Sequence, residues 1–203
     1  MNHINNTDLT LSYYQFGPII ANYKLSKEFT LELKNRGSKT TIDTRHTLAG
    51  HIDKENSFSK IDKEWFLKQT FNVFQTYLNL IKERSLEKTR TPTSLQLNNL
   101  WINFMKKGEF NPPHHHDGDI SFVIYTSVPK EIISEHREFK GRGPGPGTIQ
   151  FIYGEYSEAY KTELNFQPEE GNMYLFPASL RHFVPPFRSD VIRESISGNL
   201  YFK

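Results

Sequence analysis

The chain has 203 residues, of which 36% are hydrophobic and 14% aromatic, so it holds enough apolar surface for a folded core and is not disordered throughout. Its formal net charge of +2 comes from scattered basic residues, which gives no clear signal for a nucleic-acid partner. The chain contains no cysteine, which excludes disulfides and thiolate metal sites and favours a reducing, cytoplasmic location. No apolar run is long enough to predict a membrane span.

The first part of the chain predicts short elements. Residues 8–34 alternate weakly between apolar and polar side chains, which predicts one or two short strands with a break at Gly17-Pro18. A short helix is expected at residues 29–33. Residues 36–51 are polar and predict a loop.

The clearest helix is predicted at residues 61–84. Apolar side chains recur there every three or four residues, lysines and amides occupy the opposite face, and Ser59 is in the position of an N-cap. This pattern is typical of an amphipathic helix packed on the outside of a sheet. The polar residues 85–94 predict a linker between this helix and a β-rich second half.

Short strands separated by turn residues are predicted throughout the second half. They are expected at residues 95–105, 120–128, 148–152, 162–166, 172–176, 182–184 and 192–202. This spacing favours a double-sheet jelly roll. We therefore expect a single domain over residues 1–203, mainly β with helical support (α+β). Residues 1–90 supply N-terminal strands and a supporting helix, and residues 91–203 form a jelly-roll core, cupin-like and metal-binding.

The connection at residues 129–147 contains the glycine- and proline-rich sequence KGRGPGPG. Two interpretations remain open. The segment is either a flexible hairpin loop or a mobile lid over a site at the mouth of the jelly roll.

The most informative stretch is residues 109–129, EFNPPHHHDGDISFVIYTSVP. Two prolines exclude helix and favour extended geometry, in which alternate residues share a face. His114 and His116 then form an H-x-H pair, whereas His115 and Asp117 form the H-x-D of an iron facial triad. Either pair needs a third ligand, and His182 opens a later strand that an adjacent position in the sheet could bring close.

Strict alternation at residues 192–202 places Arg193, Ser195 and further polar side chains on one face of a strand. If this strand lines the jelly roll, that face looks into a site. Arg193 then presents a forked cation suited to binding a carboxylate, with Ser195 beside it.

Three segments together resemble a known family. HHHDGDISFVIY, GNMYLFPASLRHFVPPF and RESISGN are similar in order and spacing to the 2-oxoglutarate- and Fe(II)-dependent oxygenases found in bacteria and their phages. The resemblance covers roughly residues 100–200. It implies a double-stranded β-helix fold with Fe(II) as the metal and 2-oxoglutarate as the cosubstrate.

The resemblance also implies roles for particular residues. His114, His116 and His182 correspond to the metal ligands, and Arg193 and Ser195 to the anchor for the distal carboxylate of 2-oxoglutarate. Asn103 and Tyr125 are expected to be further contacts to the cosubstrate. The alternative ligand set, made of His115, Asp117 and His182, stays open from the residues alone.

The function implied is a dioxygenase that hydroxylates a substrate and releases succinate and CO₂. The alternative is a cupin-like three-histidine metalloenzyme that does not use 2-oxoglutarate. A third possibility is a binding or structural β-sandwich whose histidines are incidental. The sequence names no substrate, small or macromolecular, and predicts no membrane partner, while the edge strands of a jelly roll make a homodimer possible.

Overall fold

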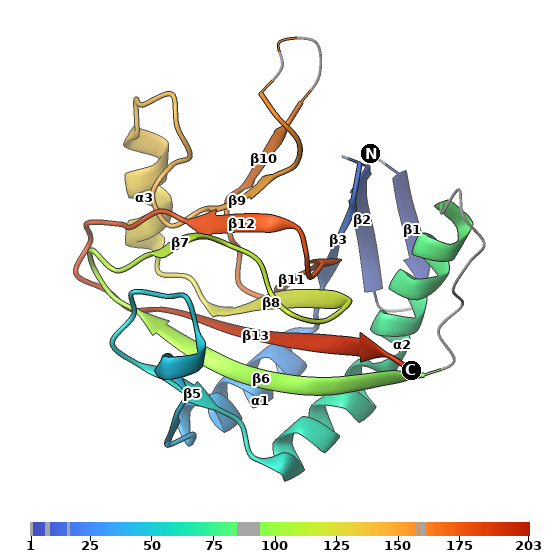
Figure 1. Cartoon of the computed structure of the whole chain (residues 1–203). Coiled ribbons are helices and arrows are strands. Elements are labelled where there is room, and N and C mark those ends of the chain that lie inside the picture. Colours follow the sequence, from blue (N-terminus) through green and yellow to red (C-terminus); the bar gives the residue numbers. More distant parts are fainter. Residues whose placement is uncertain (1, 7–8, 16, 85–93, 157, 159–160) are drawn as a thin grey trace.

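In the computed structural model of this protein, residues 2–6, 9–15, 17–84, 94–156, 158 and 161–203 are described. They form two antiparallel β-sheets that face each other, with two helices on the outer side of the larger sheet (Figure 1). Within the described residues the two sheets stay separate and do not close into a barrel. The predicted jelly roll with helical support is therefore confirmed. The predicted linker at 85–94 lies outside the described residues, apart from Ser94.

The larger sheet contains nine strands in the part of the chain that is described. In their order across the sheet they are β1 (Asn2–Asn6), β2 (Leu9–Gln15), β3 (Ile19–Lys24), β11 (Asn172–Pro177), β8 (Ile120–Ser127), β13 (Arg193–Phe202), β6 (Leu95–Met105), β5 (Glu55–Ser57) and β4 (Ile42–Asp43). Strands from the N-terminal part of the chain thus extend a central group of jelly-roll strands on both sides.

The smaller sheet lies over the central part of the larger one (Figure 1). In order across the sheet, its strands are β10 (Glu163–Phe166), β9 (Ile149–Ile152), β12 (Arg181–Val184) and β7 (Asn111–His114). The helices are α1 (Lys27–Ser38), α2 (Lys60–Arg84), α3 (Lys130–Glu138) and the 3-10 helix η1 (Arg45–Thr47).

Apolar side chains form two layers, one on each face of the larger sheet. In β8, Phe122 and Ile124 join the layer beneath α1 and α2, whereas Val123 and Tyr125 join the layer between the sheets. Alternate residues of a strand point to opposite faces, so a strand covered on both sides needs a continuous apolar run. This is why the sequence of β8 shows little polar alternation.

Helix α2 confirms the predicted amphipathic helix and its cap. The Ser59 hydroxyl accepts a hydrogen bond from the Asp62 backbone N–H at 3.2 Å, an interaction that contributes about 1 kcal/mol. The rings of Phe66 and Phe74 lie 5.3 Å and 5.6 Å from that of Phe122 on the sheet below. No helix in the described residues is long enough and apolar enough to cross a membrane.

The strands predicted after residue 94 are all present, and their bounds agree with the prediction to within one residue. The first half of the chain was predicted less well. Helix α1 is longer than expected and runs on to Ser38, because Gly37 lets it approach the sheet closely: a Cβ there would lie 2.6 Å from the Ile102 side chain. Residues 36–51 are thus wrongly predicted as a loop throughout, since they also include β4 and η1.

The segment 129–147 is not a simple hairpin loop, because it begins with helix α3. Ile132 is buried in the layer between the sheets, and the Glu135 carboxylate accepts hydrogen bonds from the backbone N–H groups of Arg188 and Ser189. The glycines and prolines that follow the helix dominated the sequence pattern and hid it. The role of this segment as a lid stays a prediction.

Candidate metal centre

The histidine-bearing corner begins as a strand, which the sequence did not predict. Strand β7 has the sequence Asn-Pro-Pro-His, and prolines are tolerated because β7 is an edge strand of the smaller sheet. It pairs with β12 so that His114 and His182 are direct cross-strand neighbours. Beyond the strand, the backbone N–H of His116 donates a hydrogen bond to the Ala178 carbonyl at 2.9 Å, which fixes the turn.

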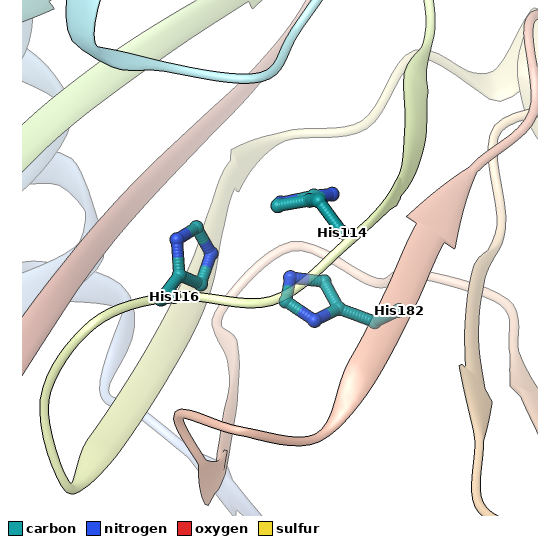
Figure 2. Close-up of side chains that lie close together, drawn as sticks. All are labelled: His114, His116 and His182. Carbon is teal, nitrogen blue, oxygen red and sulfur yellow. The ribbon is translucent and has the colours of Figure 1, made fainter.

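The imidazoles of His114, His116 and His182 face one another between the two sheets (Figure 2). One ligand nitrogen from each lies within 4.8 Å of the others, and the ring centroids are 4.3 to 5.0 Å apart. Among the described residues, these three histidines are the group of possible metal ligands that lie close enough together to hold a metal ion. The structure thus brings together the H-x-H pair and the distal histidine.

Two of the rings are oriented by backbone carbonyls. Nδ1 of His114 lies 2.7 Å from the Pro112 carbonyl oxygen, and Nδ1 of His182 lies 2.9 Å from that of Leu180. A neutral imidazole that donates its Nδ1–H in this way keeps the lone pair on Nε2 for a metal. Such carbonyl contacts fix the tautomer and the direction of the ring.

Burial favours the neutral, metal-binding form of the cluster. Desolvation lowers the pKa of His116 to about 3, and that of His182, which is 5% exposed, falls well below its usual value. The pKa of His114 is lowered by the same cause. Mutual repulsion between the imidazoles adds to the effect at His116 and His182. Three neutral imidazoles pointing at one space are a typical ligand set for a divalent transition metal.

The alternative H-x-D set is not brought together. His115 and Asp117 are exposed and point away from the three-histidine cluster, as alternation along an extended chain requires. Both line a separate cleft that adjoins the cluster. The geometry therefore supports His114, His116 and His182 as the ligand set.

A cavity beside the histidines contains the other residues singled out in the sequence. Arg193, Ser195, Asn103 and Tyr125 all line it, together with the three histidines. Ser195 is the direct cross-strand neighbour of both Asn103 and Tyr125, because β13 lies between β6 and β8. The polar face of β13 thus looks into the space between the sheets, as predicted.

Arg193 is 1% exposed, and no carboxylate lies within ion-pair distance of it among the described residues. Its Nη1 donates a hydrogen bond to the Gly147 carbonyl at 2.7 Å, while its Nε has no partner. The hydroxyl of Tyr125 is also buried without a hydrogen bond, and the guanidinium carbon lies 5.4 Å from the centre of that ring. Burial lowers the pKa of Arg193 and raises that of Tyr125 to about 12.

Sequence reasoning missed three residues of this cavity. The indole N–H of Trp101 donates to the Asn103 side chain at 3.1 Å, and its ring lies 5.7 Å from that of His116. Strand alternation could have found Trp101, since it lies two residues before Asn103. Glu55 and Asn111 also line the cavity. No pattern marks Glu55, because its strand has only three residues and is polar.

Residues 99–199 match the family model described as "Putative 2OG-Fe(II) oxygenase". Over these residues the chain belongs to the 2OG-Fe(II) oxygenase family. The matched segment contains all three histidines of the cluster, as well as Arg193 and Ser195. Fe(II) and 2-oxoglutarate are the cofactor and cosubstrate of this family. No curated protein matches the chain.

Two solved structures share the fold with TM-scores above 0.5, and a third matches a shorter part of this chain. The viral collagen prolyl hydroxylase of Paramecium bursaria Chlorella virus-1, in its 2OG complex, is 12% identical with a TM-score of 0.56, covering 89% of this chain and 94% of that one. The non-heme alpha-ketoglutarate-dependent epimerase SnoN, from nogalamycin biosynthesis, is 12% identical with a TM-score of 0.57, covering 91% and 78%. A 2OG-Fe(II) oxygenase family oxidoreductase from Burkholderia pseudomallei is 21% identical with a TM-score of 0.40; 63% of this chain matches 55% of that one, about half its length.

The residues present fit both groups that a 2OG-Fe(II) oxygenase uses. Imidazole nitrogens suit iron, and the three histidines leave coordination positions open. A buried guanidinium without a carboxylate partner is costly unless an anion joins it, and the free Nε of Arg193 and the free hydroxyl of Tyr125 are donors for one. A dicarboxylate that reaches both the histidines and Arg193 satisfies these groups.

Proposed function

We propose that this protein is a 2-oxoglutarate-dependent hydroxylase that holds Fe(II) with His114, His116 and His182. One observation carries the proposal: three neutral imidazoles converge within 4.8 Å of one another beside a buried guanidinium that lacks an anion. In this proposal the iron site and the cosubstrate site share the one cavity that all of these residues line.

We infer that Arg193 binds the distal carboxylate of 2-oxoglutarate. Charge-assisted hydrogen bonds from a guanidinium are strong and directional, particularly where burial excludes competing water. Ser195 adds a hydroxyl on the same strand face, and Tyr125 adds a second hydroxyl donor. Asn103 is held by the Trp101 indole N–H, which orients its amide toward Ser195.

When both are bound, Fe(II) and 2-oxoglutarate supply O₂-dependent oxidation of a substrate C–H bond to C–OH, with conversion of 2-oxoglutarate to succinate and CO₂. The chain positions these groups and excludes water. The Pro112 and Leu180 carbonyls hold two of the imidazoles in place, and aromatic side chains such as Phe176 surround His182. The solved structures that share the fold include a prolyl hydroxylase and an epimerase. Direct analysis of the product therefore tests the hydroxylation step.

A second candidate is a cupin-like metalloenzyme that does not use 2-oxoglutarate. The all-histidine donor set favours it, because the iron facial triad has a carboxylate in place of one imidazole. The unpaired Arg193 weighs against it, since a reaction without a dicarboxylate leaves that cation unmatched.

The test is an anaerobic titration of the untagged protein with Fe(II) and then with 2-oxoglutarate. We expect a visible metal-to-ligand charge-transfer band, followed by succinate formation when O₂ is admitted. If iron binds without producing a band, the cupin-like candidate is correct. If iron does not bind, both candidates are wrong.

A further inference from the structure

The cavity lining also contains a buried carboxylate, on strand β5, which β6 separates from the strand of Arg193. Glu55 lies in β5 and is 2% exposed. Its Oε2 is buried without a hydrogen bond, and no ion pair involves Glu55 in the described part of the chain. Leaving a buried carboxylate without donors costs several kcal/mol, so a fold keeps such a group only when something compensates for it.

Glu55 belongs to a polar row that crosses the larger sheet. It is the cross-strand neighbour of Asn103, which is the neighbour of Ser195, which in turn is the neighbour of Tyr125. Directly paired residues point to the same face, so all four side chains look into the cavity. Neighbouring strands are about 4.8 Å apart, which places the backbone of Glu55 about 10 Å from that of Ser195.

Acceptor oxygens converge at this end of the cavity. A Cβ built on Gly50 would lie 2.5 Å from Oδ1 of Asn111 and 2.9 Å from Oε1 of Glu55. The absence of a side chain at position 50 therefore lets these two oxygen atoms come together in one corner of the cavity lining. Leu48 and Ala49, just before it, line both this cavity and the cleft beside the histidines, so the corner and that cleft are neighbours.

The charges of the cavity lining leave Glu55 without a partner. Among the described residues that line the cavity, Arg193 and Glu55 are the ones with a charged side chain, since the histidines are neutral. Burial raises the pKa of Glu55 to about 7, with Glu109 and Asp43 raising it further and Arg45 opposing them. If 2-oxoglutarate neutralises Arg193, then a proton or a cation neutralises Glu55, and a cationic ligand also brings the N–H donors that Oε2 lacks.

We propose that Glu55 binds a cationic, N–H-bearing group of the substrate, a guanidinium or an alkylammonium, in the corner bordered by Gly50 and Asn111. This inference rests on the proposed function, because it concerns the substrate of that enzyme. The corner itself is formed without iron. Glu55 is then the residue that selects a basic substrate and holds it beside the three histidines.

The test uses butylguanidinium and butylammonium as probes, with butylurea as a neutral compound of nearly the same shape as the first. Binding is measured by calorimetry on the metal-free protein and on the anaerobic Fe(II)–2-oxoglutarate complex. We expect wild type to bind at least one cation at least tenfold more tightly than butylurea. Glu55→Gln, which keeps the volume and removes the charge, should reduce this preference to less than twofold.

Two further variants control the experiment. Asp53→Asn removes an exposed carboxylate two residues away, outside the cavity lining, and should keep the full preference for cations. Gly50→Ala keeps the charge of Glu55 but places a methyl group against the Asn111 and Glu55 side-chain oxygens, which must shift, and it should weaken binding of the cations at least tenfold. This second variant gives an answer even if Glu55→Gln does not fold.

Equal binding of butylurea and both cations by wild type would overturn the proposal, as would a cation preference that survives both Glu55→Gln and Gly50→Ala. These outcomes are separate from failure of the proposed function, which the absence of a charge-transfer band reports. A protein without the band can still show the cation preference, and a protein with the band can lack it.

Discussion

The two ends of the cavity are built differently. The Arg193 end belongs to β13, β8 and β6, which lie within or overlap the segment that matches the oxygenase family. The Glu55 end belongs to β5, which precedes that segment and is added at the edge of the same sheet. The chain thus combines cavity residues from the segment that matches its family with a carboxylate supplied by its N-terminal part.

The two ends also differ in how their charges are held. Arg193 is tied to the Gly147 carbonyl, which orients the guanidinium before any ligand arrives. Glu55 has no such tie, and its buried Oε2 has no donor. The comparison suggests that the first end is preorganised for a constant ligand, whereas the second becomes satisfied only when the substrate is present.

The largest effect is expected at the metal itself. Replacing His182 with Ala removes one of three ligands, so Fe(II) affinity should fall by more than about 100-fold, beyond the loss typical of a residue that only supports a ligand. His115→Ala is the matched control, because His115 is exposed and lies outside the cluster. Competition with a chelator measures both. Loss of iron in His115→Ala as well as in His182→Ala would favour the H-x-D set instead, because that set also contains His182.

At the Arg193 end, Arg193→Ala should weaken 2-oxoglutarate binding by about 100-fold, because truncating one partner of a buried charge pair costs about 2–5 kcal/mol. Fe(II) binding should change only a few-fold, since the histidines do not contact this guanidinium through any hydrogen bond that is observed. Arg193→Lys keeps the charge without the fork and should give an intermediate loss. Equal losses of iron and 2-oxoglutarate would refute the assigned role.

At the Glu55 end, Glu55→Gln should stabilise the ligand-free protein at high pH. The folded-state pKa of Glu55 is raised to about 7, so its ionised form is penalised as pH rises from about 4.5 through 7. Urea unfolding should show the variant more stable than wild type by on the order of 2 kcal/mol at pH 8, and equally stable below about pH 3.5, where Glu55 is protonated in both the folded and the unfolded state. A pH-independent difference would mean that Glu55 carries no such penalty.

The smallest effect is expected at Ser195. Ser195→Ala removes one neutral hydrogen-bond donor from the cosubstrate end, worth about 1 kcal/mol, so 2-oxoglutarate affinity should fall about fivefold. Ser197→Ala, two residues along the same face, should change it less than twofold. The charge-transfer band gives both dissociation constants, and equal losses in the two variants would remove Ser195 from the proposed anchor.

The two halves of the chain also differ in how far the sequence predicted them. Strands such as β6 and β13 were predicted almost to the residue, because one shows strict alternation and both are bounded by turn residues. The same two-residue period predicted that His114 and His116 lie on one face of the chain. Strand β5 could not be predicted, because three polar residues carry no periodicity and Glu55 becomes buried only through its pairing with β6.

The decisive measurement is a double comparison of wild type, Arg193→Ala and Glu55→Gln, each titrated with 2-oxoglutarate and with the preferred cation, butylguanidinium or butylammonium. We expect Arg193→Ala to lose only 2-oxoglutarate affinity and Glu55→Gln to lose only cation affinity, each by at least about tenfold, as is typical of buried charged partners. If either substitution weakens the binding of both ligands equally, the cavity does not have two separate binding regions. That result would contradict the assignment of Arg193 and Glu55 to different ligands.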